Sequence, residues 1–328
     1  MQSATLARPA TAASTPAAMR AARIHRFGPP DVITLETIPR PYPGPGEVLV
    51  RVHAAGVGPW DAWIRAGQSA LPQPLPLTLG SDISGTIEQL GPDVTVFAPG
   101  DQVFGVTNTR FTGGYAEYAV VTASMLAEKP HSLDHLHAAG IPVVSVTAWQ
   151  ALFEQARVGP GQTVLILGAA GNVGAFAVQL AHLTQAHVIA TCGADDASYV
   201  QAIGADTIVD HRTGRFGSIA RSADVVIDLV GGEIQMRSFA TLKAGGTLVS
   251  TVAPPDQGLA ARHGVKALFF LVEITTMHLT RLADMIDSGE LRFRLGHTLT
   301  LDEASLAHEM LGCTRSRGKG KIVLDLRR

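Results

Sequence analysis

The chain has 328 residues, of which 46% are hydrophobic, and its formal net charge at pH 7 is −2. A chain of this length and apolar content can bury a large core and suffices for roughly two domains. The near-neutral charge, without a long lysine or arginine run, excludes the strong phosphate attraction of most nucleic-acid binders. The two cysteines, Cys192 and Cys313, form no Cys-x-x-Cys pair, which favours a reducing, cytoplasmic setting.

The first eighteen residues are rich in Ala, Ser, Thr and Pro and contain no acidic residue. They lack the continuous apolar stretch of a signal peptide. This composition predicts a disordered tail over residues 1–18, with a transit peptide as the alternative. The most tempting apolar run, Ala267 to Val272, is too short to cross a bilayer, so a membrane is not an expected partner.

Two textures divide the rest of the chain. From Arg20 to Val121, short β-branched segments such as Glu47–His53 are broken by Gly and Pro, which predicts an all-β domain. After Pro142, apolar runs alternate with Ala-rich helical stretches, which is typical of a parallel sheet built from βαβ units. The expected strands are 163–167, 187–191, 225–229 and 247–251, and the expected helices are 173–183 and 197–203.

The final part of the chain is expected to be partly helical over Leu279–Leu311 and to end in a strand over Lys321–Leu326. The whole pattern therefore predicts an α/β fold in which a parallel-sheet domain is inserted between an N-terminal β domain and a C-terminal return to it.

The expected strand 163–167 runs directly into Gly168-Ala-Ala-Gly171-Asn-Val-Gly174 and then into an Ala-rich helix. A helix N-terminus presents unpaired amides and partial positive charge, and glycine lets the backbone approach a pyrophosphate. In register with Gly-x-Gly-x-x-Gly, alanine replaces the first glycine. The strand-turn-helix context makes dinucleotide binding the favoured interpretation over a tightly packed helix start.

The end of the second expected strand bears on the choice of cofactor. Cys192 stands where a carboxylate would hold the adenosine ribose of NAD, which favours NADPH, with NADH possible. Thr191 and Tyr199 can offer hydroxyl groups. Against NADPH, residues 191–200 contain no Lys or Arg, and Arg212 or Arg215 would have to supply the positive charge. Asp195 and Asp196 are expected to cap a helix and not to bind the cofactor.

The chain resembles the quinone oxidoreductase-type members of the medium-chain dehydrogenase/reductase superfamily over residues 19–326. The strings that carry the resemblance are Ala54-Ala-Gly-Val-Gly-Pro-Trp-Asp61, Gly80-Ser-Asp82-Ile-Ser-Gly85, Pro99-Gly-Asp-Gln-Val-Phe-Gly105, Gly113-Gly-Tyr-Ala-Glu-Tyr118, Ala202-Ile-Gly-Ala-Asp206, Asp228-Leu-Val-Gly-Gly232 and Gly320-Lys-Ile-Val-Leu324. The resemblance implies a Rossmann-type domain at 146–277 inserted in a GroES-like β-barrel catalytic domain formed by 19–145 and 278–328.

Zinc alcohol dehydrogenases of the same superfamily carry a Cys shortly before the Asp61-like position and a His-Glu pair after the Gly80-like glycine. Here those places hold Gly58, Ser81 and Asp82. Glycine cannot ligate a metal, and one carboxylate does not make a tetrahedral zinc site. The expectation is therefore a metal-free reductase.

Without a metal, the implied mechanism is direct hydride transfer to an acceptor held against the nicotinamide, with the protein positioning the reactants and excluding water. By resemblance, the expected catalytic positions are Asp61, Trp63 and Thr147. The expected cofactor-binding positions are Ala170, Gly171, Asn172, Val173, Gly174, Thr191, Cys192, Tyr199, Val230, Val252, Phe270, Val272 and Lys321. Trp60 and Trp63 either form an aromatic wall for a flat ring or belong to the core.

Three functions remain open from the sequence. The first is NADPH-dependent reduction of quinones or related conjugated carbonyls, and the second is reduction of the double bond in enones, alkenals or enoyl thioesters. The third is a non-catalytic NADPH-binding sensor or structural protein, because fold alone does not fix function. The resemblance also implies a homodimer, with a contact at a sheet edge near Thr247–Thr251.

Overall fold

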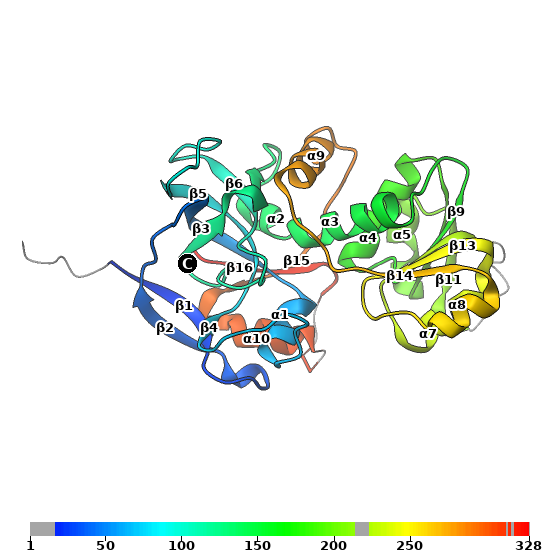
Figure 1. Cartoon of the computed structure of the whole chain (residues 1–328), viewed down its shortest axis with the longest axis horizontal. Coiled ribbons are helices and arrows are strands. Elements are labelled where there is room, and N and C mark those ends of the chain that lie inside the picture. The colour runs from blue at the N-terminus through cyan, green and yellow to red at the C-terminus, as the bar shows by residue number, and fades with distance from the viewer. Residues whose placement is uncertain (1–16, 214–222, 313, 316–317, 328) are drawn as a thin grey trace, which may run out of the picture.

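The structure is a computed structural model that describes residues 17–213, 223–312, 314–315 and 318–327. It has two lobes at opposite ends of its long axis, a β-barrel lobe and a parallel-sheet lobe (Figure 1). Most of the predicted tail lies outside the described residues, and its end is corrected, because strand β1 already begins at Ala18. In the described part of the chain, no helix has the length and apolar character needed to span a bilayer.

The barrel lobe contains two sheets among the described residues. A small antiparallel sheet has the order β2-β1-β4, and a larger one has the order β15-β16-β3-β5-β6-β8, with β7 also paired to β3. The bounds are β1 (Ala18–Ile24), β2 (Thr34–Pro39), β3 (Glu47–Val57), β4 (Leu77–Thr78), β5 (Asp82–Leu90), β6 (Gln102–Val106), β7 (Tyr118–Thr122), β8 (Leu126–Glu128), β15 (Leu295–Thr300) and β16 (Lys321–Asp325).

The second lobe is a parallel sheet in the order β11-β10-β9-β12-β13-β14. Its strands are β9 (Thr163–Leu167), β10 (His187–Cys192), β11 (Thr207–Asp210), β12 (Ala223–Asp228), β13 (Leu242–Ser250) and β14 (Lys266–Phe269). Strand β9 is almost wholly buried, because apolar clusters cover both faces of the sheet. This confirms the predicted α/β fold with an inserted parallel sheet.

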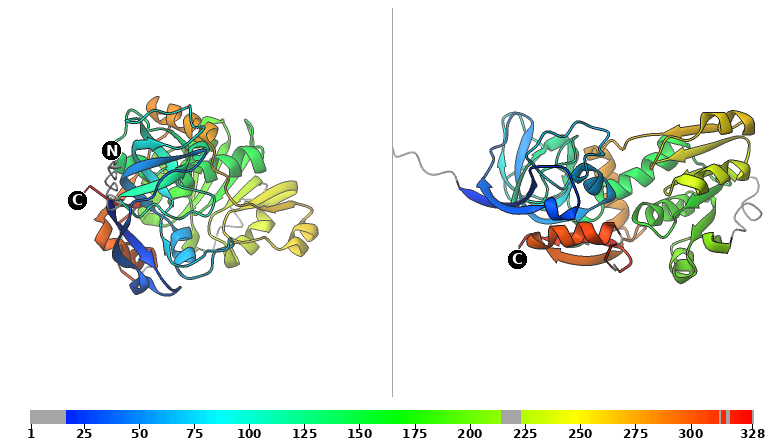
Figure 2. Two further views of the ribbon diagram at one scale, coloured as in Figure 1. Left: turned by 60° about the vertical axis from the view of Figure 1, so that its left-hand side comes forward. Right: turned by 90° about the horizontal axis from the view of Figure 1, so that it is seen from below.

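The helices of the sheet lobe are α4 (Asn172–Leu183), α5 (Ala197–Ala202), α7 (Gly232–Ser238) and α8 (Gln257–His263). Those between or against the lobes are α1 (Pro59–Arg65), α2 (His135–Ala139), α3 (Pro142–Trp149), a π-helical turn (Gln150–Gln155), α9 (Thr276–Asp287) and α10 (Ala304–Leu311). Figure 2 shows α10 and the C-terminal strands back against the barrel lobe.

One apolar cluster runs through both lobes. It joins Phe104 of β6, Val146 of α3, Phe176 of α4 and Leu279 of α9. The predicted domain boundaries at 145/146 and 277/278 therefore fall inside α3 and α9, two helices that pack against each other across the join. The lobes share a core at this crossover, which fixes the space between them.

The segment expected to form a dimer contact, Thr247–Thr251, does not lie at a sheet edge. Strand β13 pairs with β12 on one side and with β14 on the other. The sequence prediction missed β14 because it lies within an apolar run that carries no turn residue to mark its end. It also missed β15, which lies between α9 and α10.

Candidate active site

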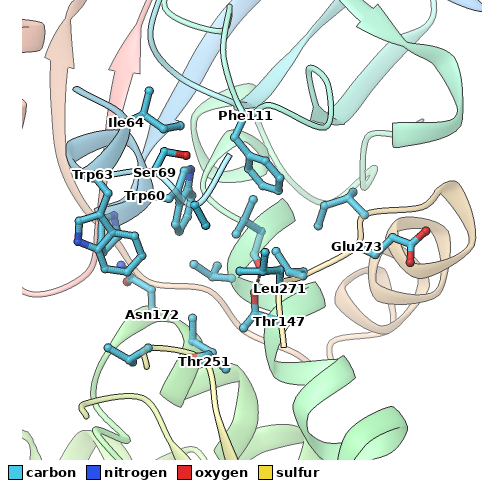
Figure 3. A pocket seen from close by; sticks show the side chains of 18 of the residues that line it. Trp60, Trp63, Ile64, Ser69, Phe111, Thr147, Asn172, Thr251, Leu271 and Glu273 are labelled. Atoms are coloured by element: carbon cyan, nitrogen blue, oxygen red, sulfur yellow. Dashed lines mark hydrogen bonds between the residues drawn. The ribbon is translucent and has the colours of Figure 1, made fainter. Parts of the chain in front are cut away.

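A cavity of about 950 Å³ lies between the lobes and is lined by residues of both. Its wall is mostly apolar. In Figure 3, Trp60, Trp63 and Ile64 enter it from α1, while Asn172 and Thr251 face it from the sheet lobe. Largely apolar clefts of this size with a few polar groups are the usual form of small-molecule sites.

The glycine turn after β9 opens onto this cavity. Gly168 has φ +77°, a conformation that favours glycine, and its amide donates to Thr191 Oγ1 at 3.1 Å. A Cβ on Gly174 would lie 2.3 Å from the carbonyl oxygen of Gly168. The turn is therefore folded tightly against the start of α4, whose first amides have no partner within the helix. This arrangement fits the pyrophosphate of a dinucleotide.

Most of the sequence-predicted residues are brought together here. Those that line the cavity are Trp63, Thr147, Gly171, Asn172, Val173, Gly174, Val252, Phe270, Val272 and Lys321. Ala170 and Tyr199 line a small pocket that shares Gly171 and Asn172 with it. Val230 lies beside the turn, because a Cβ on Gly168 would come 2.9 Å from its Cγ2. The Thr147 hydroxyl donates to the Val143 carbonyl at 2.7 Å.

Besides Val230, three predicted residues do not line either pocket. Asp61 is fully buried behind α1, where its Oδ2 accepts hydrogen bonds from the Gly58 amide at 2.8 Å and from the Tyr115 hydroxyl at 3.1 Å. The Thr191 hydroxyl supports the glycine turn, and the Cys192 side chain is buried. Each of these side chains is packed or bonded inside the protein, and their roles at the nicotinamide or the ribose stay predictions.

At the positions that correspond to zinc ligands, the indole of Trp60 fills the space. A Cβ on Gly58 would lie 2.3 Å from the Trp60 ring, and the indole Nε1 donates to Ser81 Oγ at 2.9 Å. Elsewhere in the described residues, no group of three or more His, Cys, Asp or Glu side chains is placed to hold a metal ion. The residues at this place therefore do not fit a zinc ion.

A buried ion pair lies under the same ring. Lys321 Nζ donates to Asp82 Oδ2 at 3.2 Å and sits 4.4 Å from the centroid of the Trp60 ring. Lys321 is 1% exposed although it borders the cavity. Burial raises the pKa of Asp82, and the ammonium of Lys321 opposes that shift. Lys321 thus pairs with Asp82 and lies over Trp60 while bordering the cavity, and the cofactor-binding role expected for it stays a prediction.

Burial raises the pKa of Asp61 to about 7, although the Gly58 amide and the Lys321 charge act in the opposite direction. The Asp61 Oδ1 atom has no hydrogen-bond partner and is buried. An ionised carboxylate is costly in such a place, so protonation near neutral pH is the favourable response.

The adenosine end of the site gains its cations from the C-terminal part of the chain. Lys319 Nζ lies 2.7 Å from Asp196 Oδ1, and the Arg294 guanidinium lies 4.8 Å from the centroid of the Tyr199 ring. Sequence reasoning missed both, because more than ninety positions separate them from residues 191–200. Asp196 was expected to cap a helix. Its side chain makes no capping bond to α5 and pairs with Lys319 instead.

Of the two arginines considered for the same end, the described one, Arg212, pairs with an aspartate. Arg212 is bonded to Asp210 through Nε at 3.1 Å and through Nη2 at 3.0 Å. Arg215 lies outside the described residues.

The segment that follows β14 is held over the cavity by Gln150. Its Nε2 donates to the Glu273 carbonyl and its Oε1 accepts from the Glu273 amide, both at 3.1 Å. Gln150 begins the π-helical turn, a feature that often marks functional positions. The two bonds fix Phe270, Leu271 and Val272 as one wall of the cavity.

Comparison with known proteins agrees with this geometry. Residues 44–131 match the alcohol dehydrogenase GroES-like domain, and residues 203–324 match a family described as zinc-binding dehydrogenase. The chain is 30% identical to the quinone oxidoreductase of Homo sapiens, across 94% of this chain and 98% of that protein. It is 32% identical to the mitochondrial NAD(P)H oxidoreductase RTN4IP1 of Mus musculus, across 86% and 82%.

Solved structures show the same likeness. The quinone oxidoreductase from Coxiella burnetii superposes with a TM-score of 0.88 at 32% identity, covering 95% of this chain and 100% of that one. A mycobacterial protein solved in complex with NADPH superposes with a TM-score of 0.84 at 29% identity, covering 94% and 100%.

The fold and the site therefore define a nicotinamide-dependent oxidoreductase of the medium-chain dehydrogenase/reductase superfamily. Within that superfamily, the chain belongs to the quinone oxidoreductase-like proteins, as the resemblance in its sequence implies.

The turn geometry gives a first testable prediction. Gly174→Ala places a methyl group 2.3 Å from the Gly168 carbonyl oxygen and distorts the turn, so the Kd for NADPH is expected to rise at least about tenfold. Gly159→Ala, in the loop before β9, is the matched control, because a Cβ there meets no atom within 4 Å. The measurement is NADPH titration by fluorescence, and equal Kd values for the two variants would contradict the assignment.

The second prediction concerns Asp61. Its pKa is higher in the folded than in the unfolded chain, so it keeps a proton between about pH 4 and pH 7 only when folded. Its contribution to the free energy of unfolding therefore falls as pH rises through that window, by up to about 4 kcal/mol. Asp61→Asn cannot ionise, so it lacks this pH-dependent contribution to the free energy of unfolding.

The measurement is urea unfolding at pH 5 and pH 8. The free energy of unfolding of Asp61→Asn minus that of wild type is expected to be larger at pH 8 than at pH 5. Asp302→Asn, which changes an exposed carboxylate, is the control. A difference from wild type that is the same at both pH values would show that Asp61 does not titrate in this range.

Proposed function

We propose that the chain is an NADPH-dependent, zinc-independent reductase that transfers a hydride directly to quinones or related conjugated carbonyls. The observation that carries the proposal is the Trp60 indole, which occupies the place of the metal ligands next to an apolar cavity that opens onto the glycine turn. The names of the relatives support the quinone as acceptor.

The protein's share of this reaction is positioning and exclusion of water. Bound dihydronicotinamide supplies the hydride. Gly171 and Asn172 would hold the pyrophosphate at the start of α4, while Thr147, Val252 and the wall fixed by Gln150 would surround the reactive end. An apolar wall favours a flat, uncharged acceptor and keeps water from competing with it.

NADPH is proposed over NADH on two grounds. Cys192 leaves no carboxylate at the end of β10 to bind a ribose hydroxyl, and Lys319 and Arg294 bring positive charge to Tyr199 and Asp196. Lys319 would bind the 2′-phosphate of NADPH. To do so, its ammonium would leave Asp196 and pair with the phosphate.

A homodimer and a cytoplasmic location are further proposals that follow the expectation from sequence. Relatives with mitochondrial names make the N-terminal segment the part to test for location. Size-exclusion chromatography with light scattering measures the oligomeric state, and imaging of the tagged full chain measures the location.

The direct test of function is a steady-state assay with NADPH and a panel of quinones, repeated after treatment with a zinc chelator. Oxidation of NADPH with the quinone panel, unchanged by chelation, is expected. Loss of activity on chelation would remove zinc independence, and no NADPH oxidation with any quinone would remove the proposed activity. Product analysis separates a hydroquinone from the saturated carbonyl that an alkene reductase would form.

The cofactor proposal is tested with Lys319→Ala. Loss of a charge-assisted contact is expected to raise the KM for NADPH by about tenfold and to leave the KM for NADH unchanged. Lys266→Ala, on edge strand β14, is the matched control. A parallel change in both KM values, or none, would refute the assignment of Lys319 to the 2′-phosphate.

A further inference from the structure

The described cavity wall holds two tryptophans from α1 that differ in how they are fixed. Trp63 is 43% exposed. Trp60 is half-buried and fixed on several sides, through the bond from its Nε1 to Ser81, through Lys321 on one face, and through close contact with the Gly58 backbone. An aromatic ring held so firmly at a cavity wall has lost little further freedom when a ligand stacks on it.

The buried ion pair between Lys321 and Asp82 costs free energy of hydration, which indicates a role besides packing. Lys321 and Asp82 are at most 1% exposed, and such a pair gives up the hydration of both charges, which well-packed apolar residues would not require. A cation within about 6 Å of an indole centroid is attracted to its face, and the attraction is strongest where water is excluded. The pair therefore sets the position and the tilt of the indole.

Lys321 covers one face of the Trp60 ring, and Trp60 itself lines the cavity. A ligand that enters the cavity therefore meets the indole. Figure 3 shows Trp60 and Phe111 in the same part of the cavity, across from Leu271 and Thr147. A flat ring fits between such walls with an offset stack on the indole, whereas an open-chain molecule gains no stacking.

We infer that Trp60 is the stacking platform that makes this site selective for planar, ring-shaped acceptors over open-chain enals and enones. Ser81 and Lys321 act as positioning residues that hold the indole where zinc ligands lie in related enzymes. This inference rests on the proposed reductase function and narrows its substrate class. No covalent step is added.

The test compares two acceptors, 1,4-naphthoquinone and the open-chain (E)-2-hexenal, in wild type, Trp60→Phe, Trp60→Leu and Ser81→Ala. Trp60→Leu is expected to raise the KM for naphthoquinone by about 2- to 12-fold, which is the size of an aromatic pair contact. Trp60→Phe and Ser81→Ala are expected to give smaller increases. The KM for hexenal stays unchanged in all three, because it does not stack.

A purely structural role for Trp60 would change both KM values together, and that result would overturn the inference. So would equal naphthoquinone KM values in wild type and Trp60→Leu. Circular dichroism and thermal unfolding verify that each variant folds, and Ser81→Ala, which removes a single bond to the ring, provides the result if Trp60→Leu does not.

Equilibrium dialysis of naphthoquinone against the protein keeps this inference separate from the proposed function. Binding does not depend on hydride transfer, so a Kd that rises in Trp60→Leu supports the platform even if NADPH is never oxidised. A Kd that is the same in wild type and Trp60→Leu overturns the platform even if quinone reduction is fully active.

Discussion

The buried ion pair between Asp82 and Lys321 connects two strands of the large barrel sheet that are not neighbours, because β3 lies between them. Asp82 begins β5 and Lys321 begins β16, so the pair joins the middle of the barrel to its C-terminal return. The second oxygen of Asp82, Oδ1, accepts a hydrogen bond from the amide nitrogen of Val143 at 3.2 Å, near the start of α3. One carboxylate therefore positions the barrel, its last strand and the helix that leads to the parallel sheet.

The same pair shapes the cavity. Its ammonium supports the Trp60 indole, and the indole in turn needs a glycine at position 58 to fit. Asp61, one residue further along α1, feels the charges of Lys321 and Asp82 with opposite signs, and burial decides the outcome. Gly58, Ser81 and Lys321 together hold the Trp60 ring at the cavity wall.

Much of the fold could be predicted from the sequence because its signals are local. The strand 163–167, the glycines and the following helix are contiguous, and the structure has β9 and α4 at nearly those residues. The apolar run that contains β14 has no turn residue to divide it, so the edge of the sheet was assigned to β13. A period in the sequence identifies a strand but not its neighbours.

The site was predictable where it follows from motif position and not where it depends on side-chain direction or distant partners. The resemblance placed Asp61 at the nicotinamide, and it could not show that the Asp61 carboxylate is buried. The ion pair between Lys321 and Asp82 could not be predicted, because 239 positions separate the two residues, and the cofactor-binding role expected of Lys321 stays a prediction. Lys319 reaches Asp196 across 123 positions, a distance that no local pattern encodes.

A double-mutant cycle on Asp82→Asn and Lys321→Met, read by urea unfolding, tests the central claim most directly. Each single change leaves one buried charge or its polar partner uncompensated, and we expect a loss of about 3–5 kcal/mol for each. The double variant is expected to lose much less than the sum, because no unpaired charge remains. Losses that simply add would contradict the claim that this pair organises the site.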